Sequence, residues 1–210
     1  MPRLPDGPTD IATPYGPARA HIRLPGVPPR SLLVLGHGAG GGIDAPDLSA
    51  VAGAVTARGA AVVLLEQPYR VAGRRAPAPA NQLDVAWVAV CAELTGRLPG
   101  VPLVTGGRSS GARVACRTAA LTGAVGVLAL AFPLRPPGSL KDRTAELAAV
   151  RLPVLCVNGS RDPFGVPAPT RRVQVVVVPG ADHGLRRDLP AVTAAATRWL
   201  GRRRWLTPVR

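Results

Sequence analysis

Short apolar runs alternate with stretches of helical spacing along most of this chain, and that alternation restricts its fold more than any other feature. Six runs are predicted to be buried strands: Ser31–Leu35, Ala61–Leu65, Val101–Thr105, Val125–Ala131, Val154–Val157 and Val173–Val178. Between them, apolar residues recur every three or four positions, as in Leu48–Val55, Leu83–Leu94 and Leu189–Leu200. Strands that alternate with helices favour a mostly parallel sheet with helices on both faces.

The segments around this core are predicted less directly. The Pro-rich residues 1–30 are expected to form an edge hairpin from Asp10–Thr13 and Ala18–Leu24. Asp47 is expected to cap the first helix, and further helices are expected over Ala112–Leu121 and from about Lys141. At 210 residues, with no long linker, the chain is expected to be one domain: an N-terminal hairpin (1–30), a core (31–200) and a basic tail (201–210).

Composition narrows the function classes. Hydrophobic residues make up 47% of the chain, which is typical of a globular protein, and no stretch of 18 residues is free of charges and Pro or Gly breaks. The start, Met1-Pro-Arg-Leu-Pro-Asp, lacks the apolar segment of a secretory signal. We therefore expect a cytoplasmic protein without membrane association. Cys91, Cys116 and Cys156 lie far apart among apolar residues, so we expect buried thiols, no disulfide framework and no metal site.

The net charge of +14 raises nucleic acid as a partner, but its distribution argues against that class. Lys141 is the only lysine, the arginines are spread along the chain, and Arg202-Arg203-Arg204 is the only run of three. Three Trp, two Tyr and two Phe leave little for bases to stack on. We expect no specific nucleic-acid binding, and nothing in the sequence indicates a protein partner.

A Gly-x-Ser-x-Gly motif follows the third predicted core strand, at residues 107–111. Between a strand and a helix, Gly107 and Gly111 allow the tight turn that lifts the hydroxyl of Ser109 off the sheet. The neighbouring Ser110 has no such frame, and we expect it to contribute its backbone N–H. The motif predicts a serine nucleophile.

A glycine-rich loop, Gly-His-Gly-Ala-Gly-Gly-Gly at 36–42, follows the first core strand. It lacks the Gly-Lys-Ser/Thr ending of a phosphate loop and the dinucleotide-binding spacing, although a phosphate loop is the alternative. We expect the N–H groups of Ala39 and Ser110 to form an oxyanion hole, with support from His37, Gly38 and Gly40.

A nucleophilic serine needs a base and an orienting acid. Of the three histidines, His21 is expected on the surface and His37 in the glycine-rich loop, whereas His183 follows the last predicted strand. Asp162 lies after the preceding strand and is the expected acid, because the side chain of Asp182, adjacent to the base, is expected to point elsewhere and bond its own turn.

Several segments together resemble one branch of the α/β-hydrolases: 36–42, Gln-Pro-Tyr at 67–69, 106–113, 159–165 and Ala-Asp-His at 181–183. They are similar to the domain shared by a testis-expressed hydrolase-like protein and subunit 3 of the non-specific-lethal histone acetyltransferase complex, and to bacterial proteins related to dienelactone hydrolase. The resemblance covers roughly residues 20–200. It implies a three-layer α/β-hydrolase fold with a mostly parallel central sheet, and a triad of Ser109, Asp162 and His183, which occur in the α/β-hydrolase order.

Two functional readings follow. The first is a serine hydrolase of esterase or acyl-hydrolase type that acts on a small-molecule ester or acyl substrate without a cofactor. The second is a non-catalytic hydrolase-like interaction module, since some eukaryotic proteins of the branch act as scaffolds. The complete set of three residues favours the enzyme. Phe132–Leu140 is too short for a cap domain, and Val166–Arg172 is too short for a full helix. The roles of Arg108 and Arg113 stay open between structural pairing and recognition of an acyl anion.

Overall fold

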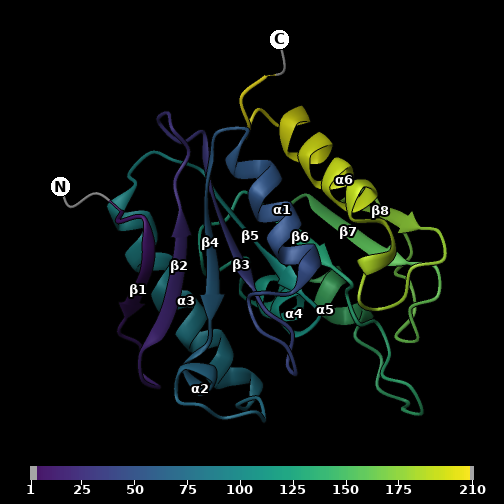
Figure 1. Ribbon diagram of the computed structural model, residues 1–210. Helices are drawn as coiled ribbons and strands as arrows, with labels where there is room; N and C mark the ends of the chain where they lie inside the picture. Colours follow the sequence, from purple (N-terminus) through teal and green to yellow (C-terminus); the bar gives the residue numbers. More distant parts are fainter. Residues whose placement is uncertain (1–3, 209–210) are drawn as a thin grey trace.

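A computed structural model describes residues 4–208, and an eight-stranded sheet runs through its centre (Figure 1). The strand order is β1-β2-β4-β3-β5-β6-β7-β8. The strands are β1 (Gly7–Ile11), β2 (Ala18–Arg23), β3 (Ser31–Gly36), β4 (Ala60–Glu66), β5 (Leu103–Arg108), β6 (Gly126–Leu130), β7 (Val154–Gly159) and β8 (Val173–Val178). Neighbouring strands along the order β4-β3-β5-β6-β7-β8 are all parallel. At the other edge, β2 pairs antiparallel with both β1 and β4. The expected mostly parallel sheet is confirmed.

Helices cover both faces of the sheet and make it the middle of three layers (Figure 1). The helices α1 (Pro46–Thr56) and α6 (Leu189–Arg202) pack together on one face, and their apolar side chains share one core cluster. The helices α2 (Pro68–Val71), α3 (Ala80–Arg97), α4 (Ser110–Thr118) and α5 (Thr144–Ala148) contribute buried side chains to the second cluster, against the opposite face, among them Tyr69, Trp87, Ala112 and Leu147.

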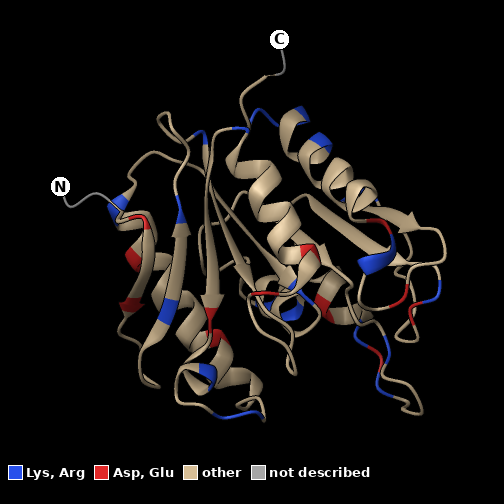
Figure 2. Ribbon diagram, in the orientation of Figure 1, with Lys and Arg blue, Asp and Glu red and all other residues tan. Residues whose placement is uncertain are grey.

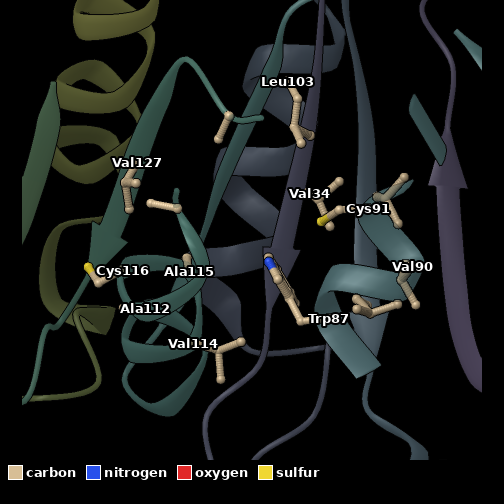
Figure 3. Close-up of a cluster of buried hydrophobic side chains, with 14 of the residues drawn as sticks. Val34, Trp87, Val90, Cys91, Leu103, Ala112, Val114, Ala115, Cys116 and Val127 are labelled. Atoms are coloured by element: carbon tan, nitrogen blue, oxygen red, sulfur yellow. The ribbon is translucent and has the colours of Figure 1, made fainter. Parts of the chain in front are cut away.

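Trp87 of α3 anchors this second core beside the start of the glycine-rich loop. The side chain is fully buried, and a Cβ on Gly36 at the end of β3 would come within 3.0 Å of its ring. Figure 3 shows Trp87 among side chains from the sheet and from α3 and α4, including Val34 and Ala112. The close packing of the Trp87 ring against Gly36 fixes the position where β3 ends and the glycine-rich loop begins.

The six core strands lie where the apolar runs predict them, and β8 has the expected bounds, but several predicted boundaries are wrong. The edge strand β1 is Gly7–Ile11 rather than Asp10–Thr13, because the hydroxyl of Thr13 donates to the carbonyl of Gly16 and closes the turn. The strand β5 spans Leu103–Arg108 rather than the predicted 101–105, because Gly106 and Gly107 continue the pairing with β3 and β6. Residues 1–3 of the expected hairpin segment and 209–210 of the expected tail lie outside the described residues.

The helix boundaries differ for local reasons. The helix α4 begins at Ser110 and ends at Thr118, rather than spanning 112–121, because a single residue separates it from β5. The helix α5 begins at Thr144 rather than near Lys141, because the Asp142 carboxylate accepts the N–H of Thr144 in a turn.

Asp47 does not cap α1, contrary to the prediction. The helix begins one residue earlier, at Pro46, with Ala45 at the capping position and no side-chain cap. The Asp47 carboxylate is fully buried and instead faces the Nε of Arg108, 3.1 Å away. The Asp47 side chain therefore forms an ion pair with a residue distant in sequence instead of capping its own helix.

Within residues 4–208, no cap covers the sheet. The loop between β6 and α5, which includes Phe132–Leu140, extends away from the sheet at the lower right of Figure 1. No helix forms over Val166–Arg172. Cys91, Cys116 and Cys156 are buried free thiols, as predicted, and burial raises the pKa of Cys91 and of Cys156 to about 12. Within residues 4–208, no helix has the length and apolar character needed to cross a bilayer.

Candidate active site

Ser109 is the single residue between β5 and α4, and its backbone adopts a conformation that is rare for residues other than glycine. Its φ is +53° and its ψ is −109°. The turn is held by the N–H of Ser109, which donates to the carbonyl of Leu130 on β6 over 2.9 Å. Strain of this kind persists only where the surroundings enforce it, and it is the geometry of a nucleophile elbow.

Glycines on both sides of the serine let the backbones of β3 and α4 approach. A Cβ on Gly107 or on Gly111 would overlap the carbonyl of Gly36. Gly107 also has a φ of +153°. Gly38 lies with its Cβ position 3.6 Å from that of Ser109, so the glycine-rich loop passes directly beside the serine. Gly40, by contrast, is exposed and has no neighbour within 4 Å of its Cβ position.

Three side chains from separate strand ends form one hydrogen-bonded chain. The Nε2 of His183 lies 2.9 Å from the Oγ of Ser109. The Nδ1 of the same ring lies 2.9 and 3.0 Å from the two carboxylate oxygens of Asp162. The carboxylate is fully buried and the imidazole is 19% exposed, so the chain runs from the interior to the mouth of the site.

The loops that carry these side chains follow β7 and β8. Asp162 is held by Asn158, whose Nδ2 lies 3.4 Å from one carboxylate oxygen, and by the N–H of Phe164, which donates to the other over 2.9 Å. The Phe164 ring packs on the imidazole of His183 with centroids 4.3 Å apart. Asp182 is exposed and accepts the N–H of Gly184 within its own turn, as predicted.

His37 is buried within the glycine-rich loop and bonds to backbone at both ring nitrogens. Gln67 donates its N–H to Nε2 over 3.3 Å, so Nδ1 carries the proton that is donated to the carbonyl of Gly38, 2.8 Å away. Burial lowers the pKa of His37 below 6.5. The Tyr69 hydroxyl adds a bond to the carbonyl of Ala39. A neutral histidine therefore ties this loop to the end of β4.

Ala39 and Ser110 line the same pocket as Ser109. In the described part of the chain, neither of their backbone N–H groups donates to a protein acceptor. The N–H of Ser110 is in the first turn of α4, where no helical partner exists. Within residues 4–208, both N–H groups beside this pocket therefore lack a protein acceptor.

Arg108, whose role the sequence leaves open, supports the His183 loop. Its guanidinium faces Asp47 of α1 and donates to the carbonyl of His183 over 2.9 Å. Burial raises the pKa of Asp47, while the charge of Arg108 opposes that shift. Arg113 likewise has a partner, since its Nε donates to Glu146 over 2.9 Å. Asn158 and Tyr69 also support the site. Of these two residues, only Tyr69 lies in a segment that the sequence resemblance singled out, Gln-Pro-Tyr at 67–69.

The pocket at the serine has a volume of about 280 Å³. Apolar residues, among them Leu83, Pro133 and Phe164, form part of its wall, and Arg113, Arg117 and Arg143 form another part. Across residues 4–208, no group of three or more His, Cys, Asp or Glu side chains is arranged to hold a metal ion.

The strand order, the helices on both faces and the elbow serine define the α/β-hydrolase class. A family model described as an alpha/beta hydrolase domain matches residues 29–195. The chain belongs to this family. A comparison with curated protein sequences found no match.

Solved structures agree on the fold. A serine hydrolase without a lid from Xanthomonas campestris is similar over 100% of both chains, with 21% identity and a TM-score of 0.78. Est1E from Butyrivibrio proteoclasticus covers 94% of this chain and is itself covered to 98%, with 16% identity and a TM-score of 0.77. A dienelactone hydrolase from Anabaena variabilis covers 93%, is covered to 98%, and has 18% identity and a TM-score of 0.73. The lidless three-layer fold matches the sequence-based prediction.

Proposed function

We propose that this protein is a serine hydrolase of esterase or acyl-hydrolase type, with Ser109 as nucleophile, His183 as general base and Asp162 as the acid that orients the base. The observation that supports this most is the continuous chain of hydrogen bonds from the buried carboxylate through the imidazole to the serine hydroxyl. A serine on a strained turn at the mouth of a pocket has no structural need for such a chain.

The reaction follows from the positions of these atoms. The Oγ of Ser109 attacks the carbonyl carbon as its proton passes to the Nε2 of His183. The carbonyl oxygen becomes an oxyanion, which accepts the N–H groups of Ala39 and Ser110. The Asp162 carboxylate stabilises the imidazolium. Collapse breaks the ester bond, and His183 returns the proton to the leaving alcohol.

A water molecule then completes the cycle. His183 takes a proton from that water, which attacks the acyl carbon on Ser109. The second tetrahedral intermediate breaks the bond to Oγ, and the serine regains its proton from the imidazolium. The products are a carboxylic acid and an alcohol, and no cofactor takes part in the balance.

The ester class is supported by what similar structures are called. An esterase domain from a Rhodothermus marinus protein has a TM-score of 0.71 to this chain, and Est1E has also been solved with ferulic acid bound. The alternative, a non-catalytic interaction module, predicts no turnover although the fold is intact. A test of activity separates the two.

The test is hydrolysis of short p-nitrophenyl esters by the wild type and three single variants. Ser109→Ala should abolish turnover, and Asp162→Asn should lower kcat by up to about 10⁴-fold. Asp182→Asn is the matched control, since within residues 4–208 this exposed carboxylate bonds only its own turn, and it should keep wild-type activity. Thermal unfolding shows that each variant is folded. Turnover by folded Ser109→Ala, or loss of turnover in Asp182→Asn alone, would overturn the assignment.

A further inference from the structure

The pocket beside Ser109 holds more positive than negative charge. Three arginines line it, from α4 (Arg113, Arg117) and from the segment just before α5 (Arg143). Only two carboxylates, Asp84 and Glu146, pair with them within residues 4–208. An apolar acyl group would leave this excess charge without a counter-ion in a small, half-enclosed space.

The two arginines of α4 are already paired. Arg113 contacts Glu146 with two of its nitrogens, and Arg117 contacts Asp84 with distances of 2.6 and 2.8 Å. Burial alone would raise the pKa of Glu146, but the bond and charge of Arg113, followed by the charges of Arg117 and Arg143, hold that pKa below its usual value. Both carboxylates are therefore already paired with the two arginines of α4.

Arg143 is the cation that remains. Within the described chain, no carboxylate lies within 4.0 Å of its guanidinium. Its backbone N–H donates to the carbonyl of Leu134 and its Nη1 to the carbonyl of Pro133, each over 2.9 Å. Arg143 is thus held through its backbone and through one guanidinium nitrogen, while most of its guanidinium N–H groups have no acceptor among residues 4–208. Burial, together with the charges of Arg113 and Arg117, lowers the pKa of Arg143, so a bound anion would relieve an existing repulsion.

The pocket lies on the acyl side of the serine. In the proposed reaction the leaving oxygen faces His183, which returns the proton to it. The pocket is lined by Ala39, Ser109 and Ser110, the residues that surround the carbonyl group, but by no residue of the His183 loop, 179–188. A group that fills it belongs to the acyl part of the ester.

We propose that Arg143 binds a carboxylate at the far end of the acyl group, so that the preferred substrates are monoesters of short dicarboxylic acids. This inference rests on the proposed function, because it places the acyl chain from the attack of Ser109. The apolar wall contacts the methylenes between the two carbonyl groups, and the guanidinium receives the charge at their end.

The experiment compares the monoethyl esters of succinic, glutaric and adipic acid with the neutral amides of the same length, in which a carboxamide replaces the free carboxylate. Acid release is followed by titration at constant pH. For the best-fitting length, the wild type should favour the charged ester by about tenfold in kcat/KM, which corresponds to about 1.4 kcal/mol. Arg143→Gln should bring this ratio close to one, because kcat/KM should fall more for the charged ester than for the neutral one.

Arg135→Gln is the matched control. Arg135 lies on the same loop but is 60% exposed, pairs with Asp142 and does not line the pocket. It should leave the ratio unchanged, whereas an equal fall in both variants would mean that long-range charge alone sets the preference, which would overturn the assignment to Arg143.

Direct binding of glutarate, measured by calorimetry, keeps the inference separate from catalysis. Wild-type protein should bind glutarate about tenfold more tightly than Arg143→Gln does. If neutral and charged esters are hydrolysed equally and glutarate does not bind, the inference fails and the proposed function stands. If no ester is hydrolysed, the proposed function fails, and Arg143-dependent binding of glutarate would still support an anion site, whereas its absence would overturn it.

Discussion

At the scale of single residues, the site depends on protonation states that are fixed by hydrogen-bond direction. His37 is the clearest case, because the N–H of Gln67 points at Nε2. A second ring proton would lie against that N–H, and burial already disfavours the charge. The neutral ring leaves Nδ1–H as the donor to Gly38 and so fixes the loop that carries Ala39.

This protonation state makes stability depend on pH. The lowered pKa of folded His37 lies below its ordinary value of 6.5. As the pH falls below about 6.5, the unfolded chain binds a proton that the folded chain does not, so the free energy of unfolding decreases. His37→Gln keeps a hydrogen-bonding side chain but does not titrate there.

We therefore expect the stability advantage of the wild type over His37→Gln to be largest near neutral pH and to narrow toward pH 5. Urea unfolding of both proteins at several pH values measures the difference. An advantage that grows as the pH falls would show that His37 is charged in the fold, contrary to its hydrogen bonds.

At the scale of elements, the site exists because β3, β5 and α4 approach more closely than side chains allow. Gly111 is the contact point, since a Cβ there would overlap the backbone of Gly36. The partner is backbone at the end of a central strand, so neither side has a flexible group that could move away.

Gly111→Ala should accordingly lower the free energy of unfolding by more than about 3 kcal/mol or prevent folding. Gly96→Ala is the control: this glycine is also helical, in α3, but it is exposed and its Cβ position is open. Alanine there should be neutral or stabilise by up to about 1 kcal/mol. Equal effects of the two substitutions would show that the close approach does not matter.

The same scale shows how far the sequence predicts this structure. Patterns that depend on burial predict the structure well. The apolar residues that recur at helical spacing in α3 are all buried: Leu83, Ala86, Trp87, Val90 and Leu94. Features set by distant contacts were not. Asp47 pairs with Arg108 across the fold rather than capping its own helix, and the strand β5 continues through glycines that carry no apolar signal.

The grouping of the three candidate site residues could be predicted because chemistry and position coincide. In a parallel sheet, residues just after strands meet at one edge, which brings together Ser109, Asp162 and His183. Among the supports, His37 was predicted to brace the glycine-rich loop and its hydrogen bonds do so. Asn158 carried no signal and the role of Arg108 stayed open, because packing alone sets the partners of these common residue types.

At the scale of the whole molecule, charge and shape limit what the protein binds. Figure 2 shows Lys and Arg residues on several helices, strands and loops rather than in one stripe. With a net charge of +14, such a surface attracts anions over long distances, but salt screens that attraction. We therefore expect specificity to depend on the small pocket at Ser109, which no cap encloses within residues 4–208.

An open pocket of about 280 Å³ buries few methylenes of a long acyl chain. Full burial, at ~0.8 kcal/mol per methylene, would raise kcat/KM about fourfold for each one. For p-nitrophenyl acetate, butyrate, hexanoate and octanoate, we expect kcat/KM to level off after butyrate, in initial rates measured below KM. A continued rise of several-fold per methylene up to octanoate would reveal a deep apolar tunnel.

The identity of the nucleophile is tested most directly by labelling with a fluorophosphonate, which forms a covalent bond only with an activated serine. Peptide mass spectrometry then locates the adduct, and His183→Ala serves as the control that removes activation. The account predicts a single adduct on Ser109, absent from His183→Ala. An adduct on Ser110, or equal labelling of wild type and His183→Ala, would contradict it.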